Sequence, residues 1–254
     1  MTAALKWYAA AAGNSVAPYE VTNSLIFTRA SSQYVLRTMS TATDSNKWTF
    51  SAWLRLSSTG ILQQLFISGV DVDDYDYIQI SSTGQIRCFH GIGGGNNGFV
   101  YTGNVLTSTT PWYHMVVAYD SSESSANKIK IYLDGSLQSI TVDTAWQGTY
   151  INRPYAHSIG VRYRPPSGYD NYFNGKMADI NFIDGQALTP SDFGETAGTW
   201  TYKKYTGTYG NNGFHLDFKD GTSTTTLGYD VSGNSNNFTL YNMTTANQST
   251  DVPA

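Results

Sequence analysis

Short runs of alternating apolar and polar residues, cut at near-regular intervals by turn residues, constrain this chain more than any other feature. Residues 48–56 form one such run and residues 85–90 another. Successive side chains of a strand point to opposite faces of a sheet, so a period of two predicts strands. Many short strands separated by turn signals predict an all-β protein, an antiparallel β-sandwich or jelly roll.

Several turns of this sandwich can be placed. Residues 74–81 and 84–90 are expected to form a hairpin, and the glycine-rich stretch 91–98 a hairpin loop. Two Asp-Gly pairs, at 134–135 and 184–185, predict two-residue hairpin turns, because both residues tolerate the left-handed conformation that such turns need. One short helix is expected at 189–194, where Thr189 can cap the first turn and Pro190 fits its first position.

The composition agrees with this fold class and divides the chain. Aromatic residues make up 14% of the 254 residues and charged residues only 13%. We expect an N-terminal arm at 1–23, a sandwich at 24–195, and a C-terminal region at 196–254 whose strands complete the sheet before a loose tail.

The single cysteine, Cys88, excludes a disulfide framework and a cysteine-based zinc site, and it is expected to be buried.

Charge and hydropathy exclude two classes of partner. The formal net charge is −4 and no cluster of Lys and Arg exists, which argues against nucleic-acid binding. No stretch approaches the roughly 20 apolar residues that cross a bilayer, so membrane insertion is not expected. The N-terminus lacks the pattern of a signal peptide, because Lys6 interrupts its apolar run.

Four segments, in this order, resemble laminin-G-like, concanavalin A-like lectin domains. They are Trp48-Thr49-Phe50-Ser51-Ala52-Trp53, Trp112-Tyr113-His114-Met115-Val116-Val117, Ile131-Tyr132-Leu133-Asp134-Gly135 and Phe173-Asn174-Gly175-Lys176-Met177-Ala178-Asp179. The resemblance covers about residues 24–195. It implies a concanavalin A-like jelly roll, here with one short helix and irregular terminal arms.

A narrower set of segments resembles virion proteins of tailed phages, especially marine ones. The segments are residues 24–27 with 32–35, 181–190 and 230–234. In such proteins a laminin-G-like module sits in a tail fibre, a head fibre or a capsid decoration protein. The resemblance implies a non-enzymatic virion protein, assembled in the host cytoplasm, that serves assembly or host-surface attachment.

This resemblance also indicates partners. Other virion proteins and further copies of the chain are expected, as a homo-oligomer or bound to a shell, with Trp7 and Tyr8 of the arm as assembly contacts. A glycan of the host surface is a further candidate partner. The alternative function is a free carbohydrate-binding module.

A polysaccharide-degrading enzyme is the third hypothesis, and the sequence argues against it. Glycoside cleavage needs two carboxyl groups about 5–10 Å apart. Enzymes that this fold resembles carry them on a Glu-x-Asp-x-x-Glu strand, which this chain lacks. Its three glutamates, Glu20, Glu123 and Glu195, are isolated from one another. We therefore expect no catalytic residues and no organic cofactor.

The segment 150–172 is the candidate contact surface, because it concentrates tyrosine and arginine around a proline-containing loop. Its candidate residues are Tyr150, Arg153, Tyr155, Arg162, Tyr163, Arg164, Tyr169 and Tyr172. Such side chains stack on sugar faces, donate to hydroxyls and dominate protein interfaces. Glycan contact, protein contact and plain packing of a long loop all fit this composition.

The densest acidic cluster is a candidate calcium site. It consists of Asp71, Asp73, Asp74 and Asp76. Calcium prefers several carboxylate and carbonyl oxygens on a flexible loop, and this spacing could supply them. The alternative is a solvated loop that leads into the strand at 74–81, since charge runs are usually exposed.

Overall fold

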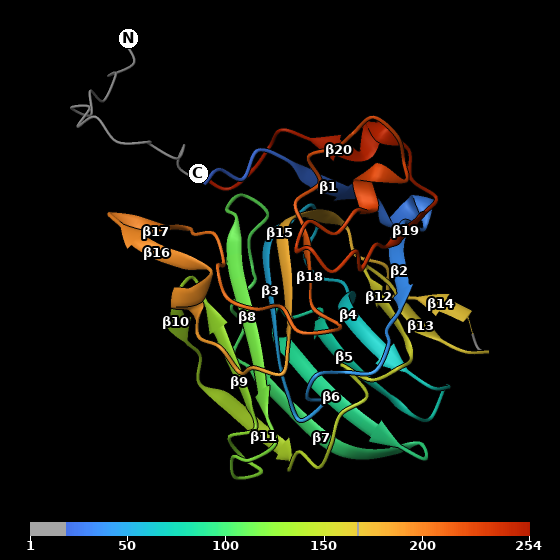
Figure 1. Ribbon diagram of the computed structural model, residues 1–254. Coiled ribbons are helices and arrows are strands. Elements are labelled where there is room, and N and C mark those ends of the chain that lie inside the picture. The colour runs from blue at the N-terminus through green and yellow to red at the C-terminus, as the bar shows by residue number, and fades with distance from the viewer. Residues whose placement is uncertain (1–18, 167) are drawn as a thin grey trace.

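The computed structural model describes residues 19–166 and 168–254 and confirms the antiparallel β-sandwich (Figure 1). Two large sheets, here called sheet A and sheet B, pack face to face. The expected arm contacts Trp7 and Tyr8 lie outside the described residues. None of the helical turns in the described ranges is long and apolar enough to cross a bilayer.

Each large sheet has eight strands within the described residues. The order in sheet A is β10 (Ser136–Leu137), β9 (Ile129–Leu133), β8 (Tyr113–Asp120), β3 (Lys47–Leu56), β15 (Gly175–Asp184), β1 (Ser24–Phe27) and β20 (Gln248–Ser249), with β18 (Phe214–Leu216) also paired to β15. The order in sheet B is β11 (Ile140–Thr144), β7 (Gly95–Thr102), β6 (Ile86–Ile92), β5 (Tyr75–Ile80), β4 (Gln63–Gly69), β12 (Ala156–Ile159), β2 (Tyr34–Thr38) and β19 (Thr239–Tyr241).

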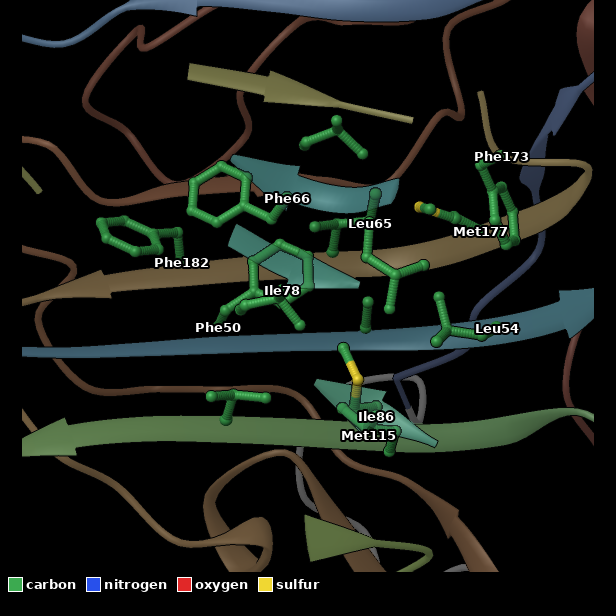
Figure 2. Close-up of a cluster of buried hydrophobic side chains, with 14 of the residues drawn as sticks. Phe50, Leu54, Leu65, Phe66, Ile78, Ile86, Met115, Phe173, Met177 and Phe182 are labelled. Carbon is green, nitrogen blue, oxygen red and sulfur yellow. The ribbon is translucent and has the colours of Figure 1, made fainter. Parts of the chain in front are cut away.

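The core lies between the inner faces of the two sheets and is rich in phenylalanine (Figure 2). Phe50 of β3 stacks on Phe66 of β4 with ring centroids 4.8 Å apart, which joins the two sheets. Phe66 also contacts Phe182 of β15 at 5.6 Å. Burying one such side chain contributes about 1.5–3 kcal/mol, so the sandwich holds together without a disulfide. Cys88 is buried in this core, as predicted.

Two of the hairpins expected from the sequence are present. Strands β5 and β6 pair in the predicted order, with Ile78 opposite Cys88. Asp134 and Gly135 both adopt positive φ, 48° and 79°, and form the two-residue turn between β9 and β10. The glycine-rich stretch 91–98 does form a hairpin between β6 and β7, but its loop is only Gly93-Gly94, because the other residues of the stretch belong to the two strands.

The hairpin predicted at Asp184-Gly185 is wrong. Asp184 is the buried last residue of β15, and its carboxylate accepts N–H groups of Thr43 at 2.7 Å and Asn212 at 3.0 Å. The chain then continues into a helical turn instead of folding back into the sheet. The reason is that Asp184 satisfies distant backbone donors, a role that the local Asp-Gly signal does not reveal.

The helical content is limited to four 3-10 turns in the described ranges: η1 (Arg29–Ser31), η2 (Pro190–Asp192), η3 (Thr226–Gly228) and η4 (Thr245–Asn247). The predicted turn is η2, in which the Thr189 N–H donates to Asp192 Oδ2 at 3.1 Å. The other three were not predicted, because three residues are too short to show a helical period.

The C-terminal region completes both sheets. Strands β18 and β20 join sheet A, whereas β19 joins sheet B beside β2. The expected loose tail is instead docked on the sandwich: β20 pairs with β1, and the carboxylate of Asp251 forms ion pairs with Arg55 and Lys176. The polar tail is held because its polar groups find partners on sheet A, which composition alone does not show.

Two small hairpins lie on opposite sides of the sandwich (Figure 1). Strands β13 (Arg162–Arg164) and β14 (Gly168–Asp170) form one hairpin, in which β13 contacts β4 of sheet B. Strands β16 (Gly194–Ala197) and β17 (Thr199–Tyr202) reach sheet A, where Trp200 of β17 donates to His114 of β8 at 2.9 Å. Each outer face of the sandwich therefore has its own hairpin, but the two faces differ in how far they are covered.

Candidate functional site

A band of aromatic side chains crosses the outer face of sheet B. Its members, here called the aromatic band, are Tyr75, Tyr77, Phe89, Phe99 and Tyr101, from β5, β6 and β7. They alternate along these strands with buried core residues, so the pleat directs them away from the core. All five are partly exposed, which leaves their rings accessible from outside.

The rings of the aromatic band contact one another from strand to strand. Tyr77 stacks on Phe89 at 5.1 Å, Phe89 lies 6.3 Å from Phe99, and Phe99 lies 5.5 Å from Tyr101. Ring pairs at such separations attract each other, so the band is a well-ordered apolar surface. Burial raises the pKa of Tyr77 to about 12, so its hydroxyl stays neutral near pH 7 and can donate or accept a hydrogen bond.

A second set of rings, here called the tyrosine stack, lies at the other side of the same face. Tyr34 of β2 stacks on Tyr241 of β19 at 4.6 Å with ring planes 2° apart. Tyr169 lies 4.9 Å from Tyr34 and stacks on Tyr163 at 4.7 Å. Tyr169 is 43% exposed and Tyr241 37%, so the stack presents ring area to solvent.

The hairpin β13–β14 connects the tyrosine stack to the aromatic band. Arg162 and Asp170 form an ion pair that closes the hairpin. The guanidinium of Arg164 lies over the ring of Tyr75, 5.1 Å from its centroid, and donates to the carbonyl of Val72 at 3.3 Å. A pocket of only about 30 Å³ opens at the hairpin. The site is thus an open surface of rings and guanidinium groups, suited to an extended ligand.

The structure divides the predicted contact residues into two groups. Those on the hairpin, Arg162, Tyr163, Arg164 and Tyr169, belong to the open surface, and Tyr172 lies 6.3 Å from Tyr34 beside it. The remaining residues, Tyr150, Arg153 and Tyr155, lie on the preceding connection. There the Tyr150 hydroxyl donates to Asp74 at 3.1 Å, and Arg153 Nε donates to the Thr149 carbonyl at 2.7 Å.

The aromatic band and the two tyrosines Tyr34 and Tyr241 were missed in the sequence. A signal was present for the band: Tyr75 and Tyr77 fall in the opposite phase to Ile78 and Ile80, which are buried. A strand that is apolar in both phases has a second apolar face, which must be covered or must bind something. For Tyr34 and Tyr241 no comparable signal exists, because they meet only through the pairing of β2 with β19.

The four aspartates proposed for calcium do not converge. Asp71 Oδ1 accepts the N–H groups of Asp73 and Asp74, so this part is a tight turn. Asp76 instead faces the core: its Oδ2 accepts the N–H groups of Tyr150 at 2.5 Å and Ile151 at 3.1 Å. Among the described residues, no group of three or more His, Cys, Asp or Glu side chains is placed to hold a metal ion.

The buried Asp76 also fixes the connection that carries Tyr150. Besides the two N–H groups, its Oδ1 lies 2.5 Å from His90 Nδ1, and its Oδ2 accepts the Thr149 hydroxyl at 2.8 Å. A buried carboxylate is tolerated only when its oxygens are satisfied in this way. Asp76 is therefore a structural anchor and not part of an open acidic loop.

A serine–histidine pair on sheet A has the wrong geometry for nucleophilic catalysis. Ser51 Oγ lies 2.9 Å from His114 Nε2, and both side chains are buried. The indole of Trp200 can only donate, and it donates to His114 Nδ1. Nε2 therefore carries the proton and donates to Ser51, so it cannot act as a base. Burial also lowers the pKa of His114 to about 4.

The glutamates Glu123 and Glu195 both lie away from the open surface. Glu123 pairs with Lys130 of β9 at 3.2 Å, and Glu195 is exposed on β16. Glu123 lies between β8 and β9 of sheet A, and the hairpin β16–β17 packs on sheet A through Trp200. Neither can therefore serve as an acid or base for a ligand that lies on the rings of sheet B.

Comparison with known proteins supports the fold. The profile of the Laminin_G_3 family, described as the concanavalin A-like lectin/glucanases superfamily, matches residues 29–194. A search of curated proteins gives no significant match. Among solved structures, a putative carbohydrate binding protein from Bacteroides ovatus superposes with a TM-score of 0.54 at 17% identity, over 88% of this chain and 59% of the other.

Two further structures superpose on about two thirds of the chain. NanB sialidase from Streptococcus pneumoniae (K499G mutant) gives a TM-score of 0.52 at 12% identity, over 69% of this chain and 29% of its own. The heptameric SAP-like pentraxin from Limulus polyphemus gives 0.50 at 15% identity, over 67% of this chain and 80% of its own.

At these identities the structures show a shared fold and no more. The family profile, however, covers more than half of the chain. The matched range runs from η1, after the first strand, to the start of β16, so β1, β18, β19 and β20 of the sandwich lie outside it. The chain therefore belongs to the Laminin_G_3 family of the concanavalin A-like lectin/glucanase superfamily.

Proposed function

We propose that this chain is a non-enzymatic carbohydrate-binding protein whose ligand lies across the aromatic band and the tyrosine stack of sheet B. The observation that carries the proposal is the continuity of this surface, which Arg164 bridges by lying over Tyr75. A polysaccharide chain presents apolar C–H faces and many hydroxyl groups. Rings can stack on the former, and arginine and tyrosine can bind the latter.

The openness of the surface favours a polymer over a small molecule. Small-molecule sites normally enclose most of their ligand, whereas the pocket at the hairpin measures about 30 Å³. An extended glycan gains contacts from several rings at once and needs no enclosing pocket. The fold of the chain is also one that lectins use, as its family describes.

The test is a glycan array followed by titration of the best ligand. Tyr169→Ala removes the most exposed ring of the stack, and we expect binding to weaken about 5- to 30-fold, the loss of about 1–2 kcal/mol typical of a central contact. Tyr229→Ala is the matched control, because Tyr229 is equally exposed at 43% but belongs to neither the aromatic band nor the tyrosine stack. Equal losses in both variants, or no glycan bound by the native chain, would refute the proposal.

A finer proposal places this activity in a tailed-phage virion, on a fibre or as a capsid decoration. It rests on the sequence segments that resemble such proteins. Two contacts favour it: Tyr19 donates to Asp179 at 2.5 Å, and Asp251 pairs with Lys176 at 2.6 Å. Residues 19–23 and the tail therefore both lie on sheet A. Neighbouring subunits bound there would leave the rings of sheet B free for a host glycan.

Labelling of intact particles tests the virion proposal. Antibody against the chain should decorate a fibre or the capsid surface in electron micrographs, and light scattering of the isolated chain should give a homo-oligomer or a shell-binding monomer. Absence of the chain from purified particles would contradict a virion role. The glycan-binding proposal would stand in that case, as a free carbohydrate-binding module.

A further inference from the structure

Two cationic side chains lie next to each other on the outer face of sheet A. Arg55 of β3 and Lys176 of β15 are paired residues in the antiparallel register. Their neighbours Leu54 and Met177 are fully buried in the core, so the pleat directs both cations outward. Like charges directly opposite each other repel. This position on the sheet therefore favours an anion between them.

The tail supplies one carboxylate to this position. Arg55 Nη1 donates to both oxygens of Asp251 at 2.7 and 2.8 Å, Lys176 Nζ donates at 2.6 Å, and Trp112 Nε1 donates at 3.3 Å. Burial by itself raises the pKa of Asp251, but the hydrogen bonds from Lys176 and Trp112 and the nearby charges of Lys176 and Arg55 lower it below its usual range. Asp251 is thus ionised near neutral pH.

This single carboxylate does not balance the two cations. A pocket of about 310 Å³ opens beside it, lined by Arg55, Lys176, Asp251, Leu56, Ser57 and Thr109. Asp251 occupies only Nη1 of Arg55, and among the described residues Nε and Nη2 of this guanidinium make no hydrogen bond. A guanidinium has five N–H donors in a fixed fork, so several remain for a second acceptor at the pocket.

The positive charge of this pocket is not shared by the chain as a whole. The whole chain is acidic, with a net charge of −4, and residues 1–18 contain no Asp or Glu side chain that could supply the missing anion. The pocket volume lies at the lower end of the range for small-molecule sites, which is large enough for a monosaccharide-sized ligand. Guanidinium and ammonium groups bind carboxylate and sulfate through charge-assisted hydrogen bonds.

We propose that this pocket binds an oxyanion, a carboxylate or sulfate carried by a ligand of up to monosaccharide size, with Arg55 and Lys176 as its charged donors. The ligand anion lies beside the Asp251 carboxylate. The site is separate from the ring surface of sheet B, so either can fail without the other.

The indole N–H of Trp112 reports on the pocket, because it already donates to Asp251. In 1H–15N spectra of the full chain, Trp112→Phe identifies this resonance among the six tryptophans. Sodium sulfate, sodium glucuronate and glucose are then titrated, with sodium chloride at matched ionic strength. We expect a saturable shift with sulfate or glucuronate and none with glucose. A tighter glucuronate site indicates an acidic sugar as ligand, and a tighter sulfate site a free anion.

Variants distinguish a ligand-binding site from a set of ion pairs that only holds the tail on sheet A. Asp251→Asn removes a repelling carboxylate, so sulfate should bind about 3- to 10-fold more tightly. Arg55→Gln should abolish the saturable shift. Lys130→Gln is the control, because Lys130 is a paired cation elsewhere on sheet A, and it should leave binding unchanged.

Two results would overturn the proposal. One is the absence of a saturable shift, beyond that of chloride, in both the native chain and Asp251→Asn. The other is an unchanged affinity in Arg55→Gln while that variant retains the native melting temperature. If Arg55→Gln does not fold, the increase in affinity expected for Asp251→Asn decides the question alone.

Discussion

The two outer faces of the sandwich differ in what covers them. Sheet A carries Trp53, His114 and Ser51 on its outer face, beneath Trp200 of the hairpin β16–β17. Sheet B carries the aromatic band, which the hairpin β13–β14 contacts only at one side. Both faces are rich in aromatic residues, but Trp53 and His114 of sheet A are buried beneath their cover, whereas the five rings of the aromatic band remain partly exposed. Aromatic content alone therefore does not identify a binding surface, because a covering hairpin can bury the aromatic side chains.

The covered face should contribute to stability and the open face to binding. The largest effect on stability is expected for a substitution in the hairpin β16–β17, which covers the outer face of sheet A. Trp200→Ala removes an indole that packs over Gly135 and donates to His114 Nδ1. We expect a loss of about 3 kcal/mol in the free energy of unfolding, from lost packing and an unsatisfied buried nitrogen. Urea titration measures it. Thr199→Ala, at an exposed neighbour, should change it by less than about 0.5 kcal/mol.

The buried histidines should make stability depend on pH. Burial lowers the pKa of His114 to about 4 and that of His157 to about 3. His157 accepts the Asn152 N–H at Nε2, so its protonation would also break a bond. The unfolded chain takes up these protons near pH 6.5 but the folded chain does not. Stability is therefore complete above about pH 6.5 and falls as the pH drops toward 4.

Each of these histidines should lower the free energy of unfolding by about 2–3 kcal/mol as the pH drops from about 6.5 to about 4. Urea titrations at several pH values measure the slope. His114→Gln should reduce the slope, whereas Tyr77→Phe on the open face should not change it. An equal slope in the native chain and in His114→Gln would show that His114 titrates normally and is not covered as described.

Loss of a ring from the open face should affect binding more than folding. Phe99→Ala interrupts the aromatic band between Phe89 and Tyr101. We expect glycan affinity to fall about 5- to 30-fold. Because Phe99 is only partly buried, the free energy of unfolding should fall by no more than about 1 kcal/mol. Calorimetric titration and urea unfolding measure the two effects, and the reverse ratio would contradict the assignment of the faces.

The smallest effect is expected at the ion pair of the hairpin β13–β14. Arg162→Gln removes the pair with Asp170, whose side chain is 48% exposed. Exposed pairs contribute about 0–1 kcal/mol, so the melting temperature should hardly change. Glycan affinity should fall by a few-fold at most, since Tyr163 and Tyr169 still stack. A loss as large as that of Phe99→Ala would show that Arg162 itself contacts the ligand.

Most of the fold could be predicted, and about half of the candidate site. Alternation placed β3, β5 and β6, because each strand buries one phase of its residues in the core. The hairpin part of the site was found through its composition, as the Tyr169 and Arg164 contacts show. The tyrosine stack was incomplete, because Tyr34 and Tyr241 are 207 residues apart and meet only in the folded sheet. Their pairing is a long-range register that local pattern cannot supply.

Local sequence pattern is enough to specify the class of the protein: period-two runs and turn pairs specify strands and hairpins through local sterics, and these produce a sandwich. Which aromatic face stays open depends on long-range packing, since Trp200 and the tail come from far along the chain to cover sheet A. The folded structure also sets the burial and the partners of individual polar groups. Asp76 became a buried anchor and Asp251 a surface ligand of two cations, because burial and partners are properties of the folded chain.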